Sequence, residues 1–230
     1  MATRRVMFGD QEVEIPEFNF KIMPLLAAAL ALWLFTGVYM VGPDEVGVVR
    51  TFGEYTRVAQ SGLNYHFPYP IEQVNTPAVT EVKRIEIGFR TLRNGQYRTV
   101  EKESLMLTGD ENIVDIDFEV VWNIKDPAQY LFNLRDPQIT IRAVAESAMR
   151  EIIAQSELAP ILNRDRGSIA SRLQELIQLT LDNYVSGVNV VRVNFDKADP
   201  PEQVIDAFRE VQAAEQERDR LEKQADAYAN

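Results

Sequence analysis

The sequence IVDIDFEVVWNI, residues 113–124, has the clearest secondary-structure pattern in the chain. Six apolar residues occupy alternate positions, and most residues between them are polar. The apolar set is Val114, Ile116, Phe118, Val120, Trp122 and Ile124, and the polar set is Asp115, Asp117, Glu119 and Asn123. Successive side chains of a strand point to opposite faces of a sheet, so this alternation predicts a half-buried strand with its acids on the solvent face.

The sequence before this strand also predicts β-structure. The segment ESLML, residues 103–107, is followed by the turn-forming sequence TGDEN, residues 108–112, which together with the strand predicts a hairpin. From residue 44 to residue 89, short alternating segments are separated by glycine and proline. This region is therefore expected to form short strands of an antiparallel or mixed sheet.

After the strand, the apolar spacing changes to that of helices. Asp136 is a candidate N-cap with Pro137 in the first turn, and a second helix is expected from Asp165 to Tyr184, with Gly187 as its left-handed cap. The residues expected to face the core are Ile141, Val144, Ala145, Ala148, Met149, Ile152, Ile169, Leu173, Leu176, Ile177 and Leu181. A strand at residues 188–195 follows, so we predict an α+β domain with helices packed on one face of a sheet.

Residues 22–41, IMPLLAAALALWLFTGVYMV, contain no charged side chain. A helix of this length would be about 30 Å long, which matches the hydrocarbon core of a bilayer, so we predict a single transmembrane helix. The residues expected to anchor it in lipid are Ile22, Leu26, Leu30, Trp33, Leu34 and Val41. A cleaved signal peptide fits less well, because the small residues lie in the middle of the apolar run.

The distribution of basic residues predicts the orientation of this helix. Arg4, Arg5 and Lys21 precede it, and Arg50 and Arg57 follow it, which slightly favours a cytoplasmic amino terminus. In a bacterium, the chain would then be a single-pass protein of the inner membrane. We expect a cytoplasmic tail at residues 1–21, the transmembrane helix at 22–41, a periplasmic domain at 42–199 and a helix at 200–230.

The segment 200–230 is predicted to be one long charged helix with a thin apolar seam. The seam residues, which are candidates for an oligomer interface, are Val204, Phe208, Val211, Leu221, Ala225 and Tyr228. Such a narrow seam does not stabilise a lone helix, so lateral packing against similar helices is expected, with a solvated single helix as the alternative. We expect the natural helix to continue beyond Asn230, because no stop signal precedes it.

Composition and motifs argue against catalysis and against nucleic acid. The net charge is −11, and phosphate binding requires clustered basic residues. The chain has no cysteine and a single histidine, His66, on which a hydrolase mechanism would depend; its aromatic neighbours favour a structural role. The acids Asp110, Glu111, Asp115 and Asp117 lack the spacing of a calcium loop, and no phosphate-binding glycine motif occurs, so no metal, cofactor or enzymatic activity is expected.

Several segments resemble the band 7 family, also called the SPFH family, which includes stomatins, prohibitins, flotillins and the HflK/HflC branch. The main one is ESLMLTGDENIVDIDFEVVWNIKDPAQYLFNLRDP, residues 103–137, which resembles the HflK type; others begin at Gly62, Val79 and Ala145. The resemblance implies a scaffold without catalytic residues. With an HflC-like paralogue it would form a large hetero-oligomer that encloses and regulates an FtsH-like membrane AAA protease. A stomatin- or flotillin-like membrane scaffold with another client is the alternative.

Overall fold

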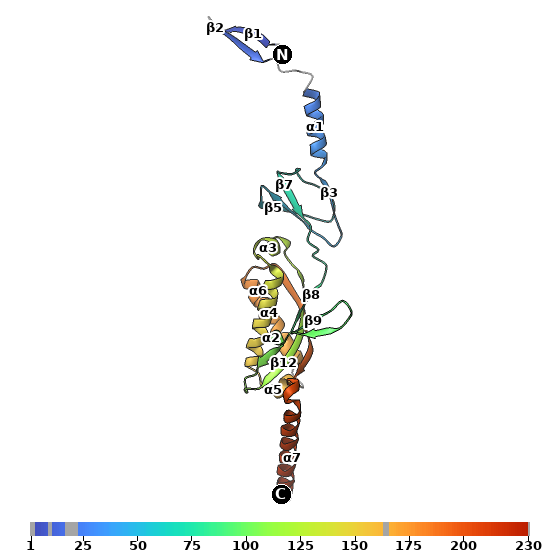
Figure 1. Ribbon diagram of the computed structural model, residues 1–230, viewed down its shortest axis with the longest axis vertical. Helices are drawn as coiled ribbons and strands as arrows, with labels where there is room; N and C mark the ends of the chain where they lie inside the picture. Colours follow the sequence, from blue (N-terminus) through green and yellow to red (C-terminus); the bar gives the residue numbers. More distant parts are fainter. Residues whose placement is uncertain (1–2, 9–10, 17–22, 163–165, 230) are drawn as a thin grey trace. The chain divides into compact units, whose positions relative to one another are not determined.

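The computed structural model describes residues 3–8, 11–16, 23–162 and 166–229 (Figure 1). The chain forms two compact units, Met1–Pro77 and Ala78–Asn230, and each is described by itself. The boundary between them falls inside the range 42–199, for which the sequence suggested a single domain.

The first unit contains one helix and several short antiparallel strands. Strands β1 (Thr3–Phe8) and β2 (Gln11–Pro16) form a hairpin within the predicted cytoplasmic tail, where sequence patterns had indicated no strand. Helix α1 (Met23–Phe35) follows. Strand β3 (Val38–Val41) pairs with β6 (Gly62–Tyr65), and β4 (Gly47–Thr51) lies between β5 (Glu54–Ala59) and β7 (Glu72–Asn75). The short strands predicted for this region are confirmed.

Helix α1 is shorter than the predicted helix at residues 22–41. It ends at Phe35, and Val41 lies in β3 with only 1% of its surface exposed, so Val41 is a buried strand residue and not part of a helical anchor. The reason is tertiary pairing: the backbone N–H of His66 donates to the carbonyl of Gly37, and β3 continues this pairing with β6. None of the helices within the described residues combines the length and apolar character that a bilayer crossing requires. Ile22 lies outside the described residues.

The second unit is built on an antiparallel sheet around β12 (Ile113–Ile124). Strand β13 (Val188–Asp199) pairs along one side of β12, and β8 (Lys83–Ile87) and β11 (Leu105–Leu107) pair along the other. The predicted hairpin is confirmed by the pairing of Leu107 with Ile113. The predicted return strand is also confirmed, and it extends four residues further than expected.

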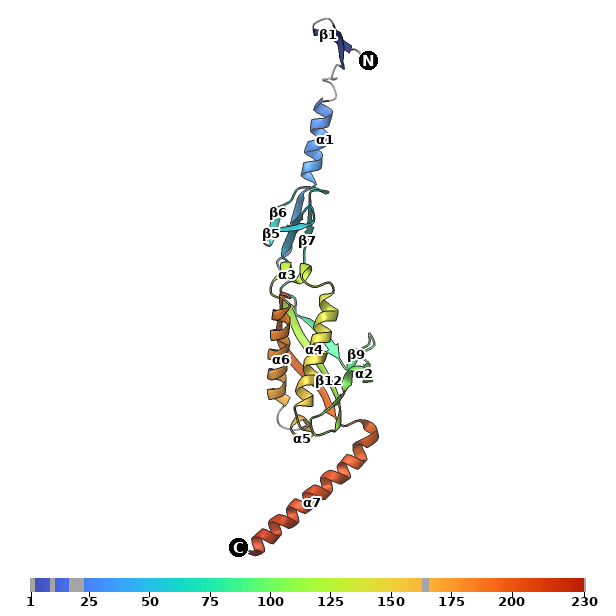
Figure 2. The ribbon, with the colours of Figure 1, turned by 90° about the vertical axis from the view of Figure 1, so that its left-hand side faces the viewer.

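Two long helices cover one face of this sheet (Figure 2). Helix α4 (Pro137–Ala154) is preceded by its N-cap, Asp136, whose carboxylate accepts a hydrogen bond from the backbone N–H of Ile139 at 3.3 Å. Helix α6 (Arg166–Asn183) runs beside α4, and the short helices α3 (Pro127–Phe132) and α5 (Leu158–Leu162) lie in the connections. All the predicted core-facing residues are buried except Leu176, which is half-buried, so the predicted α+β architecture is confirmed.

Gly187 does not cap α6, contrary to the prediction. The left-handed residue after this helix is Val185, at φ 50°, and the next backbone N–H, of Ser186, donates to the carbonyl of Leu181 at 3.1 Å. Gly187 also has a positive φ of 66°, but its role is a close backbone approach. A Cβ there would overlap the carbonyl of Asp126, so this glycine is required by the connection to β12 rather than by the helix.

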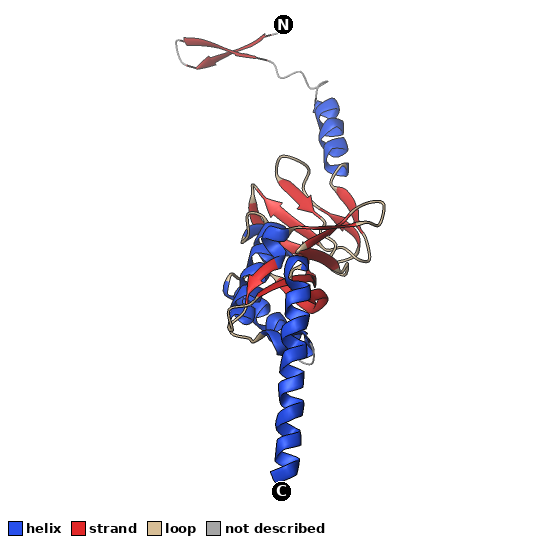
Figure 3. Cartoon of the chain, turned by 60° about the horizontal axis from the view of Figure 1, so that its bottom comes forward, coloured by secondary structure: helices blue, strands red, loops and turns tan. Residues whose placement is uncertain are grey.

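The remaining elements lie around this sheet. Strands β9 (Phe89–Thr91) and β10 (Tyr97–Thr99) form a separate hairpin, and α2 (Glu101–Ser104) follows it. After β13, a 3₁₀ turn, η1 (Glu202–Val204), leads into α7 (Ile205–Ala229), which Figure 3 shows as one continuous helix. The predicted terminal helix is therefore confirmed, with its regular part beginning at Ile205.

Candidate functional site

Two of the three carboxylates of β12, those of Asp115 and Asp117, are buried, contrary to the predicted solvent-exposed face, whereas Glu119 is half-buried. Asp115 is 8% exposed and Asp117 is 5% exposed. Their side of the strand is covered by α2 and by Gly88, whose backbone approaches so closely that a Cβ would overlap Oδ1 of Asp117. The alternation of the sequence correctly predicts which residues share this face, but the face is not open to solvent.

The two carboxylates have different surroundings. Lys197, on β13, donates from Nζ to Oδ2 of Asp115 at 2.7 Å. Oδ1 of Asp117 is buried without a hydrogen-bond partner among the described residues, and so is the hydroxyl of Ser104. Burial, followed by the nearby charge of Asp115, raises the pKa of Asp117 to about 6, although Lys197 opposes the shift. This strand therefore carries a buried carboxylic acid whose pKa lies well above the usual range of aspartate.

Asp110 has a structural role in the turn before β12. Its carboxylate accepts hydrogen bonds from the hydroxyl of Thr108 and from the backbone N–H of Leu158, the first residue of α5. The hydrogen bond from Thr108 outweighs the effect of burial and lowers the pKa of Asp110. Within the described ranges, no three His, Cys, Asp or Glu side chains are grouped so that they could hold a metal ion.

His66 lies in a loop of the first unit, as its sequence context suggested. Its ring contacts Tyr39, with ring centroids 5.2 Å apart, and its Nδ1 lies 2.7 Å from the carbonyl of Phe67. Among the described residues, no hydroxyl or carboxylate is hydrogen-bonded to its ring. The contacts of His66 are those of a packed loop residue.

Glu72 holds the same loop in place. It is 4% exposed, and Arg57 donates to both of its carboxylate oxygens, at 2.9 and 3.1 Å. The hydroxyl of Thr51 and the backbone N–H of Phe67 also donate to it. Burial by itself would raise the pKa of Glu72, but the hydrogen bonds, first among them that from Arg57, lower it overall.

The described residues of α1 present an apolar surface all round. No residue of this helix is buried; Leu30, for example, is 58% exposed, and Leu26 is similar. Trp33 and Leu34 are half-buried, and Nε1 of Trp33 donates to the carbonyl of Tyr69 at 3.2 Å, which ties the end of the helix to a loop of the first unit.

The predicted seam residues, which lie in α7 and in the preceding turn η1, are exposed with one exception. The exposed ones are Val204, Val211, Leu221, Ala225 and Tyr228. Phe208 instead packs against the core of the second unit. A change at Phe208 would therefore affect the stability of this unit as well as any contact with a partner.

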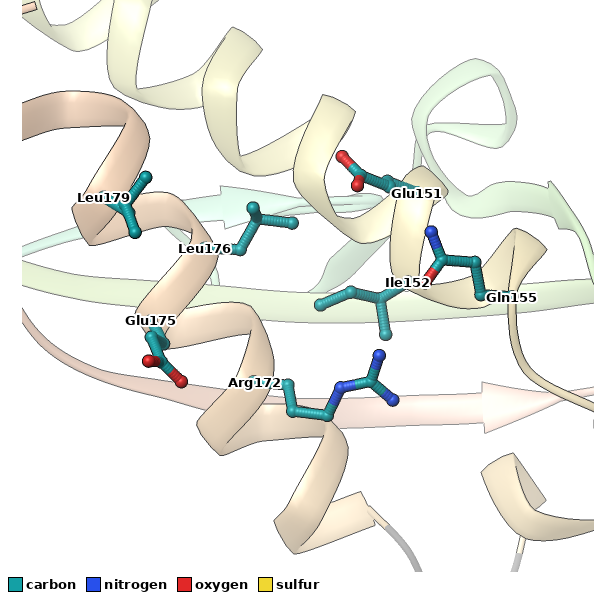
Figure 4. Close-up of a pocket in the computed structure, with 7 residues that line it drawn as sticks. All are labelled: Glu151, Ile152, Gln155, Arg172, Glu175, Leu176 and Leu179. Carbon is teal, nitrogen blue, oxygen red and sulfur yellow. The ribbon is translucent and has the colours of Figure 1, made fainter. Parts of the chain in front are cut away.

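A groove lies between α4 and α6 (Figure 4). It has a volume of about 270 Å³ and is lined by Glu151, Ile152, Gln155, Arg172, Glu175, Leu176 and Leu179. The sequence offered no signal for it, because it depends on how two helices pack. The β9–β10 hairpin was also missed, although the Asn94-Gly95 pair at its turn is a strong hairpin signal.

Comparison with known proteins agrees with this fold. The model of the SPFH domain / Band 7 family matches residues 39–229. The chain belongs to this family. As a band 7 protein it is 34% identical to the protein HflK of Vibrio cholerae over 206 residues, which cover 90% of this chain and 48% of that protein. It is 33% identical to the protein HflK of Treponema pallidum over 190 residues, 80% of this chain and 58% of that protein.

A further relative carries a functional name. The "Modulator of FtsH protease HflK" of Escherichia coli K12 is 29% identical to this band 7 chain over 216 residues, which cover 94% of the chain and 48% of the relative. The chain thus spans about half the length of the curated relatives it matches.

Proposed function

We propose that this chain is a membrane-anchored structural subunit that regulates an FtsH-like AAA protease. With an HflC-like paralogue, it would assemble into a large oligomer that encloses the protease and limits its access to membrane substrates. The main support is the similarity to the modulator of FtsH protease from Escherichia coli, which extends over 94% of the chain. The exposed apolar residues of α7 support the assembly, because several weak contacts become effective between subunits held on one membrane.

We propose that α1 lies in the inner membrane, with the amino terminus in the cytoplasm and the band 7 domain in the periplasm. An uncharged helix with apolar residues exposed on all sides is stable where its surroundings are also apolar. The 13 residues of α1 form a helix about 20 Å long. Replacing Leu30 with arginine should release part of the protein from membranes at high pH, whereas the Leu30→Ile control should remain bound.

The absence of cysteine makes the orientation directly testable. Gln60 is exposed in the first unit, so a Gln60→Cys variant carries one accessible thiol. In intact cells with a permeable outer membrane, a membrane-impermeant maleimide should label this thiol. Labelling only after lysis would contradict the proposed periplasmic location.

Isolation of the native complex tests the proposed client. The tagged protein, extracted in mild detergent, should co-purify with an AAA protease and a second band 7 protein. The Val211→Asp variant should lose much of the complex, and Gln216→Asp, a change on the same helix outside the seam, should retain it. A complete native complex without an AAA protease would contradict the proposal and favour a membrane scaffold with another client.

A further inference from the structure

The β9–β10 hairpin, residues 89–99, forms an arm: contacts with the second unit hold its base in place, and its tip is exposed. A two-stranded hairpin is marginally stable by itself, so its position depends on contacts at its base. Arg90 donates from Nη2 to both carboxylate oxygens of Glu103, at 2.7 and 2.9 Å, and Thr91 donates from its backbone N–H and its hydroxyl to Glu86. These contacts hold the arm in one orientation, while every residue from 91 to 99 is exposed.

The tip of the arm carries positive charge and apolar surface. Arg93 and Arg98 make neither an ion pair nor a side-chain hydrogen bond with any residue that the structure describes. Leu92 is 46% exposed and Tyr97 is 70% exposed. The segment 88–100 contains three arginines and no acid, in a chain with a net charge of −11. The tip therefore differs in charge from the chain as a whole.

The groove between α4 and α6 has complementary features. Its floor is apolar, from Ile152, Leu176 and the exposed Leu179, and Figure 4 shows Glu151 and Glu175 on the two helices that border it. Neither carboxylate forms an ion pair with a residue in the described part of the chain. A volume of about 270 Å³ is below the usual range for small-molecule pockets, so the groove suits one or two side chains.

We propose that the β9–β10 hairpin of one subunit docks in the α4/α6 groove of a second copy of this chain. Leu92 and Tyr97 would contact the apolar floor, and Arg93 and Arg98 would pair with Glu151 and Glu175. The groove also contains one positive charge, Arg172, which lies beside the apolar floor. In the docked position, the guanidinium of Arg172 would make a cation–π contact with the ring of Tyr97.

The positions of the two surfaces make this contact intermolecular. Figures 1 and 2 show the β9 hairpin projecting away from the layer formed by α4 and α6. A contact between different surfaces of identical subunits is heterologous, and it generates a row or a closed ring. The inference rests on the proposed function only in requiring an assembly in which two copies of this chain are neighbours.

Disulfide formation between two single-cysteine variants tests the contact. Two differently tagged full-length chains, one with Gln96→Cys at the hairpin turn and one with Gln155→Cys at the groove, are produced together in their native membrane. Because residues 1–230 contain no cysteine, each variant has a single thiol within this sequence. We expect a mixed-tag disulfide dimer, and we expect none when Gln96→Cys is paired with Lys125→Cys, an exposed position directly after β12.

Charge reversal tests the chemistry of the contact. Arg93→Glu with Arg98→Glu on the hairpin chain should reduce the disulfide yield on the order of tenfold, because like charges would then face each other. Adding Glu151→Arg with Glu175→Arg on the groove chain should restore it. The matched reversals Arg192→Glu and Glu157→Lys, at exposed positions outside both surfaces, should leave the yield unchanged.

Absence of the mixed dimer, or a yield that is insensitive to reversal of the four charges, would overturn the docking proposal. These outcomes are separate from the test of the proposed client. A specific, charge-dependent disulfide in a complex that lacks an AAA protease would support the docking contact and contradict only the proposed function.

Discussion

Replacing Asp117 with asparagine should stabilise the second unit near neutral pH. The pKa of Asp117 is raised from 3.8 to about 6, chiefly by burial, so the folded state binds more protons than the unfolded state between these values. Stability contributed by the protonated acid is therefore present at low pH and lost as the pH rises through about 6. Asparagine keeps the shape of the side chain and does not ionise.

The magnitude follows from the size of the shift. About two pKa units correspond to a loss of about 3 kcal/mol of unfolding free energy at pH 7.5, and of only about 0.6 kcal/mol at pH 4. The buried amide of asparagine also needs hydrogen-bond partners, which reduces the gain. We therefore expect Asp117→Asn to raise the unfolding free energy by about 1 to 3 kcal/mol at pH 7.5, with nearly all of the gain lost at pH 4.

Urea unfolding at several pH values measures this effect. Trp122 lies in the same strand as Asp117, so its fluorescence reports on the second unit, and a Trp33→Phe background removes the other tryptophan signal. The control is Asp115→Asn, which breaks the contact with Lys197 and should lower the unfolding free energy by about 1 kcal/mol. A loss of stability in Asp117→Asn that is equal at pH 4 and pH 7.5 would refute the reasoning.

Further changes test other parts of the structure. Val185→Gly should raise the unfolding free energy by about 1 kcal/mol in urea titrations, because a β-branched residue at φ 50° is strained; Val185→Ala, which keeps a Cβ, should gain less. Glu72→Gln should lower the stability of the first unit by about 2 kcal/mol above pH 5. The pKa of Glu72 is lowered in the folded state, so the extra stability of the wild type over Glu72→Gln should be lost as the pH falls through that pKa. Unfolding followed by circular dichroism at several pH values measures this difference. The same pH dependence of stability in both proteins would contradict the role of the Arg57 contact. Phe208→Asp should lower the Tm, because Phe208 packs on the core of the second unit. Val211→Asp should leave the Tm nearly unchanged and reduce the particle mass measured by light scattering, because Val211 is exposed. The reverse result would assign the two residues the opposite roles.

Some of the site could have been found in the sequence. The Asn94-Gly95 pair indicates a hairpin turn, and Arg93 and Arg98 flank it, so the basic arm has a local signature. The groove has none. Glu151 and Glu175 are 24 positions apart and look like ordinary solvent-facing residues of two helices. They border the same groove only because α4 and α6 pack side by side.

The sequence by itself determined the main elements of the second unit: the strand at 113–124, the two long helices and the return strand. These features depend on periodicity, which specifies the residues that share a face of a strand or helix. Only the tertiary structure decided what covers each face. Asp117 became a buried acid because Gly88 and α2 lie over it, and α1 ended at Phe35 because the next residues pair with β6. The neighbours responsible come from distant parts of the chain, so a local pattern could not reveal them.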